Sequence, residues 1–141
     1  MTFAKVGFVL VPAAWLFLVT AAPEAAQSKS VVDGVFTEAQ ATRGNEVYQR
    51  ECSSCHGEGL GGDGFAPALA GTEFLGNWNG TTVGDLYDRI RISMPPSNPS
   101  SVNAQAKADI IAHVFKANKY PAGKEELTPD TLKPIKIELP K

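Results

Sequence analysis

Two cysteines and a histidine carry the clearest chemistry in this chain, in the run Cys52-Ser53-Ser54-Cys55-His56. A Cys-x-x-Cys-His run is the attachment signature of a c-type haem. The two thiols add to the haem vinyl groups as thioethers, and the imidazole that follows directly is carried under the iron as its proximal ligand. The spacing therefore predicts one covalently attached haem c, held by Cys52, Cys55 and His56.

A bare Cys-x-x-Cys pair also occurs in zinc sites and in disulfide redox motifs. A zinc site would need two further thiol or imidazole ligands at finger-like spacing. The chain has no other cysteine, and its only other histidine, His113, lies far downstream. A thioredoxin-like motif would lie near a βαβ pattern, which the sequence does not contain. Haem attachment is therefore the favoured interpretation.

Two more residues are candidates to complete such a site. Proximal imidazoles usually donate their second N–H to a carboxylate or a backbone carbonyl. No acidic candidate stands out, so we expect a carbonyl near Pro67 to accept from His56. Met94 is the only methionine besides the initiator, and Pro95 disfavours helical geometry at the residue before it. A lone methionine is often core filler, but one in a proline-fixed loop is better explained as the axial ligand opposite His56.

The segments between these residues are expected to be loops. The glycine-rich run 57–64 follows no predicted strand and lacks the Lys-Ser/Thr ending of a phosphate-binding loop, so it is interpreted as a turn-rich loop around the haem edge. Residues 74–80 are expected to form an aromatic loop. Its Trp78 has an indole N–H that needs a partner if the ring is buried; a haem propionate and an ordinary core or interface position remain equally open.

Three helices are expected from periodicity and capping residues. The first covers about 38–51, capped by Thr37 with Gln40 three residues on, and its Gly44 is expected to mark a close crossing with another helix. The second is capped by Thr81 or Thr82 and ends near Met94, with its two arginines on a solvated face. The third covers about 104–118, and the helical wheel places His113 on its polar side, in solvent and not on iron.

The first 22 residues have the order of a secretory signal peptide. Lys5 is followed by an uncharged apolar run over residues 6–19, and small residues follow at 20–22. An uncleaved membrane anchor is the alternative, although the run is short for a span of about 20 residues and Pro12 interrupts it. Both alternatives predict export, to the periplasm or elsewhere outside the cytoplasm, with membrane attachment only if the segment is retained.

The rest of the chain is expected to form one domain with two extensions. At 141 residues and a formal net charge of −2, it has room for one domain and no indication of a nucleic-acid partner. Residues 23–36 are interpreted as a flexible leader and 37–120 as the folded domain. Residues 121–141, rich in proline, are expected to form an extended tail that lies on the domain or reaches a partner.

With the attachment motif, Pro67, Trp78 and Met94, the chain resembles the monohaem class I cytochrome c family over about residues 37–120. The resemblance implies an all-α cytochrome c fold, with three to four main helices wrapped around one covalently bound haem and the iron held by His56 and Met94. More narrowly, four motifs are similar to short cytochromes associated with quinoprotein dehydrogenases: Ala66-Pro67-Ala68-Leu69-Ala70-Gly71, Trp78-Asn79-Gly80-Thr81, Asp85-Leu86 and Met94-Pro95.

These features predict an exported one-electron carrier without enzymatic activity of its own. With both axial positions filled, the iron would have no open site for a substrate, and His/Met ligation raises the potential. The expected donor is a dehydrogenase, such as a quinoprotein, and the expected acceptor is a terminal oxidase or another cytochrome. The alternatives are a haem-based peroxidase-like or gas-binding domain with a displaceable Met94, and a dedicated subunit of one dehydrogenase complex.

Overall fold

The structure, a computed structural model, describes residues 1, 2 and 29–140 of the chain. The predicted signal peptide, apart from its first two residues, and residues 23–28 of the predicted leader lie outside these residues. The described part is helical, and its only β-type pairings are isolated bridges. The helices are α1 (Glu38–Glu51), α2 (Ser53–His56), α3 (Thr72–Trp78), α4 (Val83–Ser93) and α5 (Ala104–Ala117), with 3-10 turns η1 (Val31–Asp33) and η2 (Pro99–Ser101).

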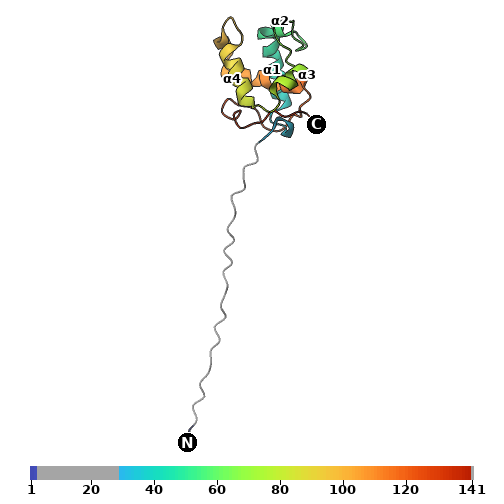
Figure 1. The fold of residues 1–141 in the computed structure, drawn as a ribbon. Coiled ribbons are helices and arrows are strands. Elements are labelled where there is room, and N and C mark those ends of the chain that lie inside the picture. Colours follow the sequence, from blue (N-terminus) through green and yellow to red (C-terminus); the bar gives the residue numbers. More distant parts are fainter. Residues whose placement is uncertain (3–28, 141) are drawn as a thin grey trace.

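The five α-helices confirm the all-α class predicted from the sequence, and Figure 1 shows how they are arranged. In that view α4 lies on one side of the domain, α2 and α3 lie on the other, and α1 and α5 pass between them. Within residues 29–140, no helix is both long enough and apolar enough to cross a membrane.

The crossing of α1 and α5 is close because α1 has a glycine at the contact. A Cβ atom added to Gly44 would lie 1.8 Å from the backbone oxygen of Asp109 in α5. Only a residue without a side chain lets the two backbones approach this far. The close crossing predicted at Gly44 is confirmed, and so is the cap of α1, where Thr37 Oγ1 accepts from the backbone N–H of Gln40 at 3.1 Å.

The second predicted helix is α4, and its start is fixed by a capping box. Thr82 Oγ1 accepts from the backbone N–H of Asp85 at 3.1 Å, and the Asp85 carboxylate accepts from the backbone N–H of Thr82 at 3.0 Å. The helix ends at Ser93, and Met94 has extended backbone angles, φ −129° and ψ 136°. The structure thus selects Thr82 over Thr81 as the cap and confirms the extended geometry at Met94.

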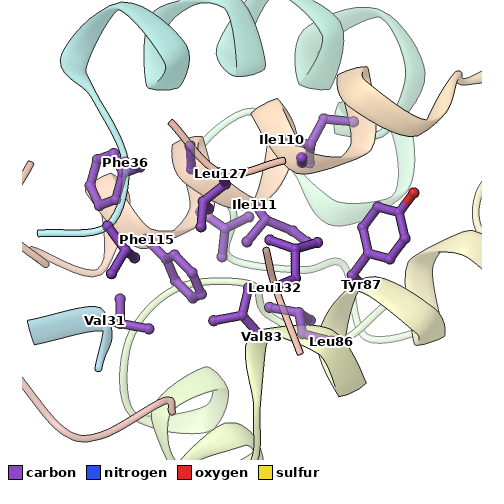
Figure 2. Close-up of a cluster of buried hydrophobic side chains, with 14 of the residues drawn as sticks. Val31, Phe36, Val83, Leu86, Tyr87, Ile110, Ile111, Phe115, Leu127 and Leu132 are labelled. Atoms are coloured by element: carbon purple, nitrogen blue, oxygen red, sulfur yellow. The ribbon is translucent and has the colours of Figure 1, made fainter. Parts of the chain in front are cut away.

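The hydrophobic core contains residues from segments that the sequence places outside the domain. Figure 2 shows part of this cluster. Val31 and Phe36 from the predicted leader and Leu127 and Leu132 from the predicted tail lie among side chains of α4 and α5, and each is at most 1 % exposed. The prediction of a flexible leader is therefore wrong for residues 30–36, which pack against the core.

The C-terminal tail lies on the domain, which is one of the two alternatives that the sequence leaves open. The backbone of Ile137 donates to Thr81 at 3.0 Å, and Val83 donates to Ile135 at 2.9 Å. Ile135 and Ile137 are both buried. The tail is anchored between α3 and α4, so the packed unit extends beyond the predicted limits of 37–120 at both ends.

Two local predictions are wrong. Residues 74–78, expected to be part of an aromatic loop, belong to α3. The backbone of residues 71–79 makes the hydrogen bonds of a helix. His113 does not lie in solvent: its ring centroid is 5.2 Å from that of Tyr48 in α1, and its Nε2 is buried with no hydrogen-bond partner among the described residues. The wheel analysis failed because α1 covers a second face of α5.

Candidate functional site

The two cysteines lie on a continuous turn at the end of α1. Cys52 caps α1, its N–H donating to Tyr48 O at 2.9 Å, and α2 follows at once and carries Cys55 and His56. Both thiols are free, with Cys55 exposed and Cys52 partly buried. Burial, with a smaller contribution from the charges of Glu51 and Cys55, raises the pKa of the Cys52 thiol to about 11. Cys52 and Cys55 are therefore two separate thiols on one helical turn.

His56 is oriented by a hydrogen bond to a backbone carbonyl. Its ring is buried, and Nδ1 lies 2.9 Å from the carbonyl oxygen of Pro67. A carbonyl can only accept, so Nδ1 carries the proton and Nε2 keeps its lone pair, which is the form that binds a metal. The predicted carbonyl partner is confirmed, and the geometry leaves Nε2 as the atom available to iron.

The glycine-rich run forms a loop that folds back onto the attachment turn. The N–H of Gly62 donates to the carbonyl of His56 at 2.8 Å, and Tyr48 Oη donates to the carbonyl of Gly57 at 2.6 Å. Gly62 has φ +74°, and a Cβ atom there would lie 2.6 Å from the carbonyl oxygen of Ala66. Burial raises the pKa of Tyr48 to about 12, so its hydroxyl stays a donor at neutral pH.

Met94 begins the loop that connects α4 to η2. Its side chain is partly buried, and its N–H donates to the carbonyl of Ile90 at 2.9 Å. The next part of the loop is held from α5, where Lys107 Nζ donates to the carbonyl of Pro99 at 2.5 Å. These contacts fix where the thioether leaves the helix, while the role of Met94 as an iron ligand stays a prediction.

Lys107 is a residue that sequence reasoning missed. It is 4 % exposed, and burial lowers the pKa of its ammonium group, which the charge of Arg91 lowers further. A lysine on a predicted helix normally indicates a solvated face, so no local signal distinguishes it. The hydrogen bond from the Tyr48 hydroxyl to the carbonyl of Gly57 likewise has no signal in the sequence pattern.

Trp78 ends α3 and is partly buried. Its ring centroid lies 6.5 Å from that of Phe74, and the ring packs against the edge of the core. The hydrogen-bond partner of its indole N–H, with a haem propionate as one candidate, stays a prediction.

The chemistry of these groups fits a covalently bound haem. Attachment needs two unpaired thiols, and the proximal ligand needs an imidazole nitrogen with a free lone pair; Cys52, Cys55 and His56 supply these. Partly exposed apolar side chains are also available to cover a porphyrin, among them Leu75 and Ile90. The described residues contain no cluster of three or more His, Cys, Asp or Glu side chains that could hold a metal ion by themselves.

Comparison with known protein families identifies a matching family. The model of the family described as "Cytochrome C oxidase, cbb3-type, subunit III" matches residues 39–114, which run from the first turn of α1 into the last turn of α5. Neither the search of curated proteins nor the search of solved structures gives a match.

The match covers more than half of the chain and includes the whole attachment turn, the loop to Pro67, α4 and Met94. It agrees with the helical fold and with the donor set built around His56. The chain therefore belongs to the family described as cytochrome c oxidase, cbb3-type, subunit III, and carries a monohaem class I c-type cytochrome domain with one covalently attached haem c.

Proposed function

We propose that this protein is an exported one-electron carrier that receives electrons from a dehydrogenase and passes them to a downstream acceptor. A cytochrome c domain transfers electrons through its haem, and that much follows from the family. The observation that supports the fuller proposal best is the His56–Pro67 hydrogen bond, which leaves Nε2 of a buried imidazole free on the same turn as both thiols. Direction of transfer, partners and export are the proposed parts.

When bound, the haem supplies an iron that takes up and releases one electron. In the proposal, Cys52 and Cys55 would attach the group, and His56 Nε2 and Met94 Sδ would bind the iron. A thioether ligand favours the reduced iron and raises the potential. The side chains of Leu75 and Ile90, which are partly buried against the core, would help to exclude water, and no side chain needs to act as acid, base or nucleophile.

The proposed donor is a dehydrogenase, such as a quinoprotein, on the basis of the motif similarity around Pro67, Trp78 and Met94. The proposed acceptor is a terminal oxidase or another cytochrome. The description of the matching family names a subunit of a cytochrome c oxidase, and this supports the oxidase as acceptor. Export, to the periplasm or an equivalent compartment, is supported by the signal-peptide pattern of residues 1–22.

The test of the carrier proposal is the replacement of its sixth ligand. Met94→Ala is expected to keep its covalent haem but to lose the long-wavelength band of methionine-ligated ferric iron, to fall markedly in potential and to bind carbon monoxide when reduced. Ile92→Ala, two residues away at a 65 % exposed position, is the matched control and should behave as the unaltered protein. A Met94→Ala variant with the original band and potential would show that the ligand assignment is wrong.

The same measurements separate the carrier from a haem-based enzyme or gas sensor. Carbon monoxide binding by the unaltered reduced protein at neutral pH would favour the peroxidase-like or gas-binding alternative, since it requires a ligand that leaves easily. Mass spectrometry of the exported protein tests the remaining points: the mass should exceed that of the chain by one haem, and the N-terminus should begin near residue 23.

A further inference from the structure

We propose that Phe65 and the acidic side chains of residues 46–73 form the docking surface for a basic electron-transfer protein. We refer to residues 46–73 as the docking segment. This inference rests on the proposed carrier function and names the chemical class of its partner. In Figure 1 the docking segment includes α2, at the end of the domain opposite residues 29–36.

Phe65 is a large apolar side chain with no cover. It is as exposed as a free side chain, at 101 % of the reference area, while the other phenylalanines among the described residues are buried. Its backbone is nevertheless held in place, because Asp63 Oδ1 accepts from the N–H groups of both Phe65 and Ala66, at 2.9 and 2.8 Å. These bonds lower the pKa of the Asp63 carboxyl, so they persist at neutral pH.

The turn that presents Phe65 belongs to the haem-attachment structure. Phe65 lies two residues before Pro67, whose carbonyl orients His56. On the other side of the turn, the N–H of Gly62 donates to the carbonyl of His56. Gln49 in α1 adds a 3.3 Å bond to the carbonyl of Glu58. A partner that covers Phe65 is therefore brought next to the turn that carries the two thioether positions. Because the backbone that carries Phe65 is already held in place, little backbone entropy is lost when the partner binds.

The negative charge of the domain is concentrated in the same segment. The docking segment has five acidic side chains and one basic side chain, whereas the described residues outside it, 29–45 and 74–140, have nine acidic and ten basic. All five acidic side chains are exposed, and none forms an ion pair with another described residue. They are Glu46, Glu51, Glu58, Asp63 and Glu73.

Together these features specify the partner's surface. An exposed aromatic anchor in a segment whose charges are mostly negative has the composition of a transient interface, with an apolar centre and a charged rim. Unpaired carboxylates attract lysine and arginine during the encounter and orient the partner before contact. The fitting partner therefore presents basic side chains around an apolar depression that receives the Phe65 ring.

The experiment measures electron transfer between the full-length haem protein and a lysine-rich cytochrome c, used as a basic protein probe. The second-order rate constant from rapid mixing is expected to fall as salt rises, because screening removes attraction between opposite charges. Phe65→Ala should lower it about tenfold at both low and high salt, and Phe65→Trp should restore it. Glu51→Gln combined with Glu58→Gln should lower it several-fold at low salt only.

Matched controls lie in the tail, where Leu139 is an exposed apolar side chain and Asp130 an exposed acid. Leu139→Ala and Asp130→Asn should leave the rate constant unchanged, and every variant should keep the potential and ligand band of the unaltered protein. A rate constant that rises with salt, or an effect of Phe65→Ala no larger than that of Leu139→Ala, would overturn the docking proposal. So would loss of a dimer in Phe65→Ala by sedimentation, since the occupant would then be a second copy.

Electron exchange with a small cationic redox complex such as hexaammineruthenium separates a failure of the docking surface from a failure of the carrier function. If the protein exchanges electrons with this complex but the basic probe is insensitive to Phe65, the docking surface is refuted and the carrier function stands. If the unaltered protein exchanges electrons with neither the complex nor the probe, the carrier function fails and the docking proposal fails with it.

Discussion

The crossing of α1 and α5 at Gly44 allows one substitution to be worked through in detail. In Gly44→Ala the new Cβ atom would lie 1.8 Å from Asp109 O and 2.4 Å from Asp109 C. Ordinary contact begins at 3.4 Å, so the helices must separate by about 1.6 Å at this point. Both neighbours are backbone atoms of a helix, and no flexible side chain can move aside.

Two opposing effects set the size of the change. Alanine is favoured over glycine inside a helix by about 1 kcal/mol, while overpacking costs typically about 1–3 kcal/mol and occasionally more. Because the obstruction is backbone, we expect the upper end of that range and a net loss of about 2 kcal/mol in the free energy of unfolding. For a domain of this size the midpoint of thermal unfolding should fall by on the order of 10 °C.

The assay is thermal and urea unfolding of the haem-loaded protein, followed by far-ultraviolet circular dichroism. Gly76→Ala is the matched control, because Gly76 is also helical, in α3, and a Cβ atom there meets nothing within 4 Å. It should be neutral or slightly stabilising. A Gly44→Ala protein as stable as Gly76→Ala would refute the close crossing as the reason for glycine at this position.

Three further outcomes follow from buried polar side chains. Gln40→Ala should cost about 3 kcal/mol, because the buried N–H of Leu127 loses its acceptor and the C=O of Leu127 keeps only Gln105 as a donor, and urea unfolding measures this. Burial lowers the pKa of His113, so the imidazole binds a proton more readily in the unfolded chain than in the folded one. Stability should therefore fall as pH drops through about 6.5. His113→Phe should remove that part of the pH dependence. Lys107→Met should loosen the loop held at Pro99, shown by a weaker methionine-to-iron band as temperature rises.

Each of these has a comparison that would contradict it. Gln49→Ala, at an exposed glutamine of the same helix, should cost far less than Gln40→Ala. The His113 effect should be separate from that of Glu125 and Glu126, whose lowered pKa values place their loss of stability at more acidic pH; an unchanged slope in His113→Phe would exclude His113 as its source. Lys107→Arg should retain the band if the contact to Pro99 is what matters.

The parts of the fold that the sequence predicts are those with short-range signals. α1 and α4 begin at Thr37 and Thr82, whose hydroxyls bond residues three positions on. α5 is capped in the same way by Asn103, whose side chain accepts from the N–H of Ala106. The carbonyl partner of His56 was also predictable, because the chemistry of the imidazole demands an acceptor and no carboxylate of the nearby chain stood out as one.

The parts that the sequence does not predict depend on contacts between distant segments. α3 is only seven residues long and contains Gly76, a poor helix former. The pairing of Ile137 with Thr81 joins residues far apart in the chain. Apolar and charged residues alternate over 135–139, but this run is too short to indicate a partner. His113 was misplaced because a helical wheel shows which residues share a face but not how many faces are covered.

The wrapped C-terminal segment has a consequence for how the protein is made. Leu132, Ile135 and Ile137 are synthesised after all five α-helices, yet they fill the core beside α4. A nascent chain that still lacks them leaves apolar surface of its helices uncovered and cannot complete its tertiary structure. Synthesis order therefore delays final packing until Ile137 has been added, and the two thiols are made well before the segment that closes the core.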